Sequence, residues 1–384
     1  MRFVEQKLAP LKDVPAHGNR KLHLHPLVVM LVMSFYDPMI RSLRTIEANS
    51  VREPLTGDVA RRMARSTTSD ALTALDPQLL RQVIGELHAQ VPDLKKKDQT
   101  LFSLLRRLVA ADGSYFNTFA NVTWALAHTK TNRAKQAQIR LNLQIDAASW
   151  VPLVVSISGG EACDGSEPDA VAKDLLRDVL YLIDRNFIDF DFLKAVLEHY
   201  SDFIVRMRTN APAYKVVREL PLCPEDLAAG VLSDSIVQLT GRGAPATPLR
   251  CVRVRHASKP GEEVELLTSL TDEAIAAHVI GAAYQQRWQV ELFFRWLKLW
   301  CNFDHLLNTS RNGITMQFYA IVIATLLMHI HLGRKVSKYT LLALRQIALG
   351  LATEEQMAQY LARRDREREL AEARRARKEA AKKS

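Results

Sequence analysis

The stretch that decides how this chain folds is Tyr284-Gln-Gln-Arg287-Trp-Gln-Val-Glu291-Leu-Phe-Phe-Arg-Trp-Leu-Lys298. Its polar side chains Tyr284, Arg287, Glu291 and Lys298 are separated by three, four and seven positions. At about 100° per residue, a helix places these four side chains within an arc of roughly 60°. We therefore predict one long helix over residues 272 to about 300, with a polar stripe along one side.

Most other positions of this predicted helix are apolar, which is typical of a buried helix. A carboxylate such as Glu291 then needs a partner, because an unpaired buried charge is costly. Two interpretations stay open from this helix alone. Arg287 and Arg295, each four residues from Glu291, predict a structural ion network, whereas the stripe as a whole predicts metal or phosphate chemistry.

Two further acidic residues directly follow apolar, strand-like runs. Asp112 precedes Gly113, and Asp184 is followed two positions later by Asn186, so each acid lies where a predicted strand meets a turn. Acids at the ends of neighbouring strands can converge on one site. Taken singly, each of them is more typical of a turn or a helix cap.

Three carboxylates provide what a pair of Mg²⁺ ions requires. Hard cations prefer oxygen ligands, and magnesium keeps coordination positions open for water and phosphate. Two such ions, about 3.5 to 4 Å apart, activate the attacking oxygen and stabilise the leaving oxygen of an in-line displacement at phosphorus. We predict that Asp112, Asp184 and Glu291 are the catalytic residues and the metal ligands.

The rest of the stripe predicts contacts with a nucleic acid. We expect Tyr284, Arg287 and Lys298 to bind phosphates beside the scissile bond, where they offset the charge of the transition state. Trp288 is a candidate for stacking on a displaced base, although its apolar neighbours favour a core tryptophan. His329 closes an apolar helix and is predicted to have a core or capping role.

These motifs resemble those of bacterial insertion-sequence transposases with a DDE triad. The similarity is to the subgroup whose last acid lies in a Tyr-x2-Arg-x3-Glu-x6-Lys signature, here ending at Lys298. Asp112-Gly-Ser is similar to the first acid motif of the family, and Leu-Ile-Asp184-Arg is similar to its second. Ser114 and Asn186 depart from the family pattern, in which Thr and Gly are commoner. The resemblance extends from about residue 104 to residue 332.

The resemblance implies an α/β fold. This fold would have an RNase H-like catalytic core with a β-strand insertion domain, a helical N-terminal domain and a helical C-terminal region. The implied activity is that of a DNA transposase, which cuts mobile-element ends by two-metal-ion phosphoryl transfer and joins the 3′ hydroxyl to target DNA. The implied cofactor is Mg²⁺, as two ions that Mn²⁺ can replace. The implied partners are the terminal inverted repeats, target DNA and a second copy of the chain in the DNA complex.

Changes in composition along the chain predict five segments. They are a helical N-terminal domain at 1–100, the first part of the core at 101–210, the β insertion domain at 211–270, the second part of the core with the Glu291 helix at 271–335, and a basic helical tail at 336–384. The insertion has three strand candidates, at 236–240, 249–255 and 264–268.

Two short helical patterns at 58–64 and 69–75 surround Ser66-Thr-Thr. They predict either a DNA-binding helix-turn-helix or a plain helical bundle.

Charge, cysteine spacing and hydropathy limit the possible settings. The formal net charge is +10, which favours a polyanionic partner. The four cysteines include no Cys-x-x-Cys pair, so no zinc finger is predicted and a reducing cytoplasm is favoured. The longest apolar runs, 27–33 and 318–328, are shorter than a bilayer requires, which predicts core helices and no membrane association. We expect a bacterial cytoplasmic protein associated with the nucleoid.

Two other functions remain open at this point. One is a catalytically inactive, transposase-derived DNA-binding protein, against which the intact set of three acids argues. The other is an RNase H-like nuclease that cuts DNA without joining it.

Overall fold

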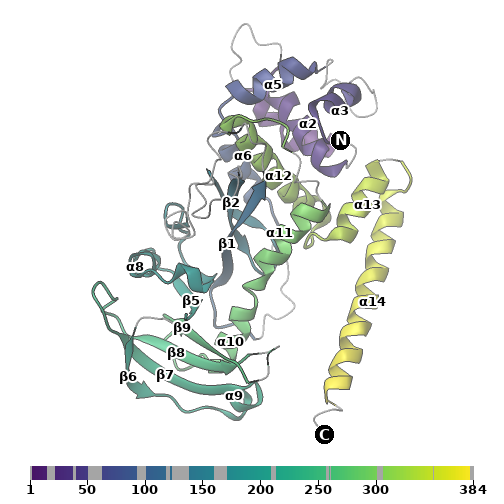
Figure 1. The fold of residues 1–384 in the computed structure, drawn as a ribbon. Coiled ribbons are helices and arrows are strands. Elements are labelled where there is room, and N and C mark those ends of the chain that lie inside the picture. The colour runs from purple at the N-terminus through teal and green to yellow at the C-terminus, as the bar shows by residue number, and fades with distance from the viewer. Residues whose placement is uncertain are drawn as a thin grey trace.

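The computed structural model describes most of the chain as a mixed α/β fold (Figure 1). The described residues are 2–14, 22–37, 40–50, 63–92, 101–117, 122, 138–159, 171–208, 213–256, 259, 261–300, 306–348 and 350–380. Within them, a single sheet has nine strands in the order β3-β2-β1-β4-β5-β9-β8-β7-β6. Strands of this sheet position two of the predicted acids, Asp112 and Asp184.

The first five strands form the core half of the sheet. They are β1 (Arg107–Asn117), β2 (Gln138–Asp146), β3 (Pro152–Gly159), β4 (Val179–Ile183) and β5 (Asp202–Arg206). β1, β2 and β3 pair antiparallel, whereas β4 is parallel to β1 and β5 is parallel to β4. All five residues of β4 are buried, as is usual for a parallel strand covered on both faces.

The remaining four strands extend the same sheet beyond β5. They are β6 (Tyr214–Glu219), β7 (Val231–Leu239), β8 (Leu249–Arg255) and β9 (Glu263–Thr268), and the short helix α9 (Pro224–Ala228) connects β6 to β7. β9 pairs antiparallel with β5, with Ile204 opposite Thr268, so backbone hydrogen bonding is continuous across the insertion. β6 is a fourth strand that the sequence analysis missed, because its mostly exposed side chains lack an apolar alternation.

The two faces of the core sheet are covered by different helices. Alternate residues of β1 and β4 belong to a large core shared with helices α11 (Trp288–Trp300) and α12 (Arg311–Leu332) and with the N-terminal helices. These residues are Leu108, Ala110, Leu180 and Leu182. The residues between them belong to a second core shared with helix α8 (Phe190–Glu198), namely Val109, Ala111, Tyr181 and Ile183. Because successive side chains of a strand point to opposite faces of the sheet, this alternation also predicts which face each following residue occupies.

Helix α12 (Arg311–Leu332) is the central helix of the larger core. The helices around it are α1 (Arg2–Lys7), η1 (Ala9–Lys12), α2 (Leu24–Tyr36), α3 (Leu43–Asn49), α5 (Arg65–Ala74) and α6 (Leu79–His88). α12 is long and apolar enough to cross a membrane, yet 89% of its most apolar window is buried inside the protein. The prediction of two apolar core helices is confirmed by the burial of α2 and α12, and His329 is fully buried as predicted.

The helix-turn-helix interpretation is wrong in its central feature. Ser66, Thr67 and Thr68, predicted as the turn, lie inside α5, and residues 58–62 lie outside the described residues. Thr68 is fully buried, and its hydroxyl donates to the carbonyl of Ala64 within the helix. Tertiary burial has therefore overridden the local preference of small polar residues for turns.

The long helix predicted over 272–300 is two helices, α10 (Ala277–Gln285) and α11 (Trp288–Trp300). Between them, the Arg287 amide bonds to the Tyr284 carbonyl, and the Val290 amide bonds to the Arg287 carbonyl. These are three-residue steps, tighter than those of an α-helix. The break places Arg287 in a turn.

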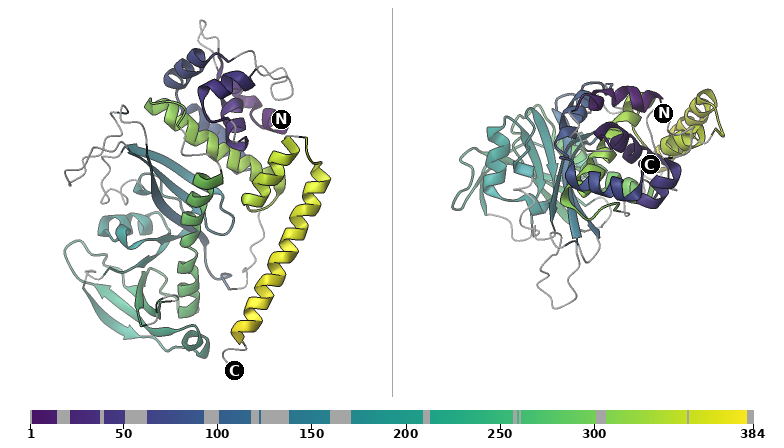
Figure 2. Two further views of the ribbon diagram at one scale, coloured as in Figure 1. Left: turned by 45° about the vertical axis from the view of Figure 1, so that its right-hand side comes forward. Right: turned by 90° about the horizontal axis from the view of Figure 1, so that it is seen from above.

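The C-terminal part is helical, as predicted. It consists of α13 (Lys338–Ala348) and α14 (Glu354–Ala380). In Figure 1 and in the left-hand view of Figure 2, α14 runs from α13 along one side of the molecule, and the N-terminal helices and β6–β9 lie at opposite ends.

A buried ion pair joins the insertion strands to the start of α10. Arg250 of β8 donates two hydrogen bonds to Asp234 of β7, at 2.8 and 2.6 Å, and both side chains are 2% exposed. Arg250 Nη1 also donates to the carbonyl of Ile275, at 2.8 Å. One guanidinium therefore connects two strands and the segment that leads into the helix pair.

We predict that Arg250→Ala lowers the free energy of unfolding by about 3 to 5 kcal/mol, because it leaves a buried carboxylate without its partner. Urea denaturation followed by circular dichroism measures the change. Arg253→Ala on the same strand is the matched control. Its pair with Glu263 is about half exposed, so the expected loss is about 0 to 1 kcal/mol. Equal losses for the two variants would contradict the prediction.

Candidate active site

Asp112 and Asp184 lie at the same level of the sheet, on the neighbouring strands β1 and β4. Asp184 directly follows β4, as predicted, but the prediction that Asp112 ends a strand is wrong, because β1 continues past it to Asn117. The parallel pairing of β1 with β4 sets Ala110 opposite Leu182, and each acid comes two residues after one of these partners. Neighbouring strands are about 4.8 Å apart. Since side chains alternate, both acids share the face that Ala110 and Leu182 occupy, which is the face covered by α11.

Helix α11 packs on this face and carries Glu291, which is linked to Asp112 through Arg287. Arg287 Nη2 donates to Glu291 Oε1 at 2.7 Å, and Arg287 Nη1 lies 3.9 Å from Asp112 Oδ2. The charge of Asp184 also acts on Asp112 and on Arg287. The Arg287 guanidinium, whose side chain is 14% exposed, therefore bonds to Glu291, lies near Asp112 and is within electrostatic range of Asp184.

Arg287 also keeps these acids apart. Among the described residues, one group of three His, Cys, Asp or Glu side chains has its ligand atoms within 4.8 Å of one another. Asp112, Asp184 and Glu291 do not form that group, so their carboxylates are farther apart than this. Arg287 occupies the space between Asp112 and Glu291 that a cation would need. One guanidinium therefore bridges the carboxylates of Glu291 and Asp112, at 2.7 and 3.9 Å.

The three acids concentrate negative charge at a partly buried site. The pKa of Asp112 is raised from 3.8 to about 6, mainly by burial and to a smaller extent by the charges of Glu291 and Asp184. A hydrogen bond from the Gly113 amide, 2.7 Å long, and the charge of Arg287 act in the opposite direction. Asp112 is thus in an environment that favours either a proton or a cation beside it.

Tyr284 and Lys298 occupy opposite ends of the stripe. Burial raises the pKa of Tyr284 to about 12, so its hydroxyl keeps its proton at neutral pH, and the charges of Arg287 and Asp184 both act on it. Lys298 Nζ donates to Ser114 Oγ at 2.7 Å and to the Tyr115 carbonyl at 3.1 Å, and burial lowers its pKa. Lys298 is therefore anchored on β1 two residues beyond Asp112, and the Ser at position 114 supplies the oxygen that holds it.

Trp288 is not the core residue that its apolar neighbours favoured. Its side chain is 48% exposed, and the guanidinium of Arg287 lies 6.0 Å from the centre of its ring. Of the two arginines considered as structural partners of Glu291, Arg287 forms the bond whereas Arg295 is exposed. An exposed indole next to the charged cluster is available for stacking.

The sequence analysis missed the neighbours of Gly113 on β2. A Cβ atom at Gly113 would lie 2.3 Å from Arg140 Nε and 2.8 Å from Asn142 Oδ1. Arg140 and Asn142 are buried on the opposite face of the sheet from Asp112. Their signal was the alternation of polar and apolar residues in β2, which is equally typical of a strand with one solvent-exposed face.

Comparison with known proteins identifies the family. Residues 103–327, more than half of the chain, match the family model described as the transposase DDE domain. The chain belongs to this transposase family. Its similarity to single relatives is modest and partial.

A putative transposase, y4zB, from Sinorhizobium fredii is 26% identical over 208 residues, which cover 54% of this chain and 56% of the relative. A probable transposase for insertion sequence element IS5377 from Geobacillus stearothermophilus is 28% identical over 209 residues, 53% of this chain and 51% of the relative. This transposase-family chain thus spans about half the length of both relatives. A putative transposase for element IS4SA from Synechocystis is 20% identical over 286 residues, covering 72% and 74% of the two chains.

Among solved structures, the chain is similar to piggyBac transposase in a synaptic complex with hairpin DNA. The sequence identity is 13% and the TM-score is 0.44, over 94% of this chain and 78% of the other. A likeness this distant carries no argument about the site.

The raised pKa of Asp112 predicts how stability depends on pH without metal. Because the folded-state pKa is about 6 and the ordinary value is 3.8, the stabilising contribution of the protonated group is present below pH 3.8 and is lost as pH rises through about 6. Asp112→Asn should therefore raise the free energy of unfolding by about 1 to 3 kcal/mol near pH 8 and by much less near pH 4.

Urea denaturation in chelator at both pH values measures this difference. The exposed acid Asp191 provides the control, since Asp191→Asn should change stability little at either pH. A destabilised Asp112→Asn variant at the higher pH would contradict the assignment of Asp112 to a crowded anionic site.

Proposed function

We propose that this chain is a DNA transposase, with Asp112, Asp184 and Glu291 as its catalytic acids. The observation that carries the proposal is the level position of the two aspartates on neighbouring parallel strands, with Glu291 joined to Asp112 through Arg287. Membership of the transposase DDE domain family supports the same reaction class. The proposed reaction cuts the ends of a mobile element and joins the 3′ hydroxyl to target DNA.

We propose further that the core is RNase H-like, with β6–β9 as its insertion. Three antiparallel strands followed by two parallel strands, with helices on both faces, support this interpretation. The proposed segments keep the boundaries 1–100, 101–210, 211–270, 271–335 and 336–384. The hydrogen bonding between β5 and β9 means that the insertion adds to the core sheet rather than forming a sheet of its own.

The donor set suits magnesium. Three carboxylates offer only oxygen ligands. Burial, with a smaller contribution from the charges of Glu291 and Asp184, raises the pKa of Asp112, and a divalent cation would offset both effects on the ionised carboxylate. We propose that Asp112, Asp184 and Glu291 hold two Mg²⁺ ions, which Mn²⁺ can replace. When bound, these ions supply Lewis-acid activation of the attacking and leaving oxygens.

The other residues of the stripe would bind and orient the DNA. Arg287, once displaced from Glu291, has a guanidinium free to pair with a phosphate in two places. Tyr284 keeps its proton and can donate a hydrogen bond, and Lys298 presents its charge beside β1. Trp288 is proposed to stack on a displaced base at the entrance of α11.

The proposed partners are the terminal inverted repeats, target DNA and a second copy of the chain in the DNA complex. The net charge of +10 supports a polyanionic partner. The proposed location is the bacterial cytoplasm, close to the nucleoid.

The decisive test replaces each acid singly by Ala and measures cleavage of a labelled element end in Mg²⁺ and in Mn²⁺. Loss of one ligand removes several kcal/mol of transition-state stabilisation, so the cleavage rate should fall by about 10³-fold or more. Glu198→Ala, an exposed acid on α8, is the control and should cut normally.

Undiminished cutting by any one of the three variants would reject that residue as catalytic. A wild-type protein that binds the ends but cuts in neither metal would support an inactive DNA-binding protein. Cutting without joining would instead support a nuclease.

Replacing Trp288 separates a stacking role from a packing role. Stacking on a base contributes about 1 to 3 kcal/mol, so Trp288→Ala should weaken binding to a pre-cut element end by about 10-fold or more, whereas Trp288→Phe should retain most of it. Because the side chain is half exposed, neither variant should shift the thermal midpoint much. Fluorescence anisotropy measures the binding. Equal affinities with a lowered midpoint would indicate a packing residue.

A further inference from the structure

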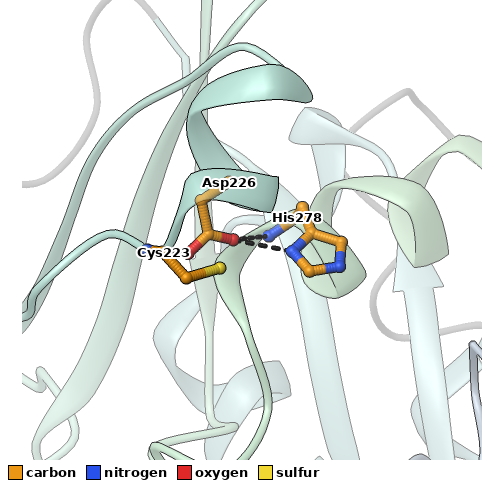
Figure 3. Close-up of side chains that lie close together, drawn as sticks. All are labelled: Cys223, Asp226 and His278. Carbon is orange, nitrogen blue, oxygen red and sulfur yellow. Dashed lines mark hydrogen bonds and ion pairs between the residues drawn. The ribbon is translucent and has the colours of Figure 1, made fainter.

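Three ligand-type side chains meet where the insertion strands join the helix pair of the catalytic site (Figure 3). They are Cys223, which precedes α9, Asp226 within α9, and His278 in the first turn of α10. Their ligand atoms lie within 4.8 Å of one another. Among the described residues, they form the group of ligand side chains that is close enough to hold one metal ion. The cluster is separate from Asp112, Asp184 and Glu291.

Hydrogen bonds hold the Asp226 carboxylate between the two other side chains. Its Oδ1 accepts from both Nδ1 and the backbone amide of His278, each at 2.8 Å, and its Oδ2 accepts from the Cys223 amide at 3.0 Å. Asp226 is 3% exposed, whereas Cys223 and His278 are partly exposed. The buried Asp226 carboxylate is thus held in place by hydrogen bonds, while Cys223 and His278 leave the cluster accessible from solvent.

The chemistry of the donors selects a class of ion. A thiolate, an imidazole and a carboxylate are ligands of zinc and of similar divalent transition metals, whereas magnesium avoids sulfur. The Cys223 thiol donates to Asp226, and this hydrogen bond raises the pKa of the thiol. The exposed Glu225 adds a carboxylate that also accepts from the thiol. The thiol proton of Cys223 therefore lies between the sulfur and the carboxylates, where a bound cation would take its place.

We propose that Cys223, Asp226 and His278 bind one zinc-class ion, with a fourth position open to water or to Glu225. The ion would connect α9 to the first turn of α10, whose last turn carries Tyr284. It would therefore fix the insertion against the helix pair that presents Arg287 and Glu291. Its role is that of a structural clamp, and it does not depend on the proposed transposition chemistry.

Cobalt titration of the purified full-length protein tests this site, because a thiolate bound to Co²⁺ gives a charge-transfer band that oxygen ligands cannot give. We expect the band to saturate at about one equivalent and to be reversed by Zn²⁺. Cys223→Ser should abolish it, and His278→Ala should weaken zinc binding by about 10-fold or more in competition with a chromophoric chelator.

Two controls make the result specific. Cys251→Ser changes a buried cysteine on β8 outside the cluster and should keep the band, and Asp112→Asn should keep it as well. Far-ultraviolet circular dichroism checks that each variant is folded. The proposal is overturned if wild-type protein gives no thiolate band, or if folded Cys223→Ser protein retains both the band and the affinity.

Discussion

The parallel pairing of β1 with β4 is the constraint on which the candidate site depends. In this register, Ala110 lies opposite Leu182, and the acids that follow each of them by two positions become neighbours on one face. A shift of the pairing by one residue would turn one acid to the opposite face of the sheet. The complete burial of β4 fixes this register, because an apolar strand covered on both faces cannot slip without exposing its side chains to water.

Electrostatic interactions also link the residues of the candidate site. Burial raises the pKa of Asp112, and repulsion from Glu291 and Asp184 adds a smaller contribution in the same direction. Arg287 offsets part of this effect by bonding to Glu291 and approaching Asp112, so its guanidinium supplies positive charge beside both acids.

The insertion strands bear on the same site from one side. Because β9 pairs with β5, the sheet that carries Asp184 continues without interruption into β8 and β7. Arg250 and the group of Cys223, Asp226 and His278 then tie these strands to α10. The start of α10 is therefore held by contacts with the insertion strands and α9. A change in the insertion should alter the positions of Tyr284 and Arg287, which follow along the same helix pair.

The sequence by itself determined which residues are candidates for the site, because local patterns mark them. The three, four and seven spacing predicted a shared stripe, and both acids were predicted at strand ends. Asp184 directly follows β4, as predicted, whereas Asp112 lies inside β1, because the strand continues through Gly113 to Asn117. The helical burial of residues 27–33 and 318–328 was also determined locally, since unbroken apolar runs bury themselves in any fold.

Only the tertiary structure decided the features that depend on distant neighbours. The turn at Arg287, the exposure of Trp288 and the helical state of Ser66-Thr-Thr each contradict a local preference. The pairing of β5 with β9 and the meeting of Cys223 with His278 join segments more than fifty residues apart. Contacts of this kind follow from how whole elements pack, and short-range spacing carries no record of them.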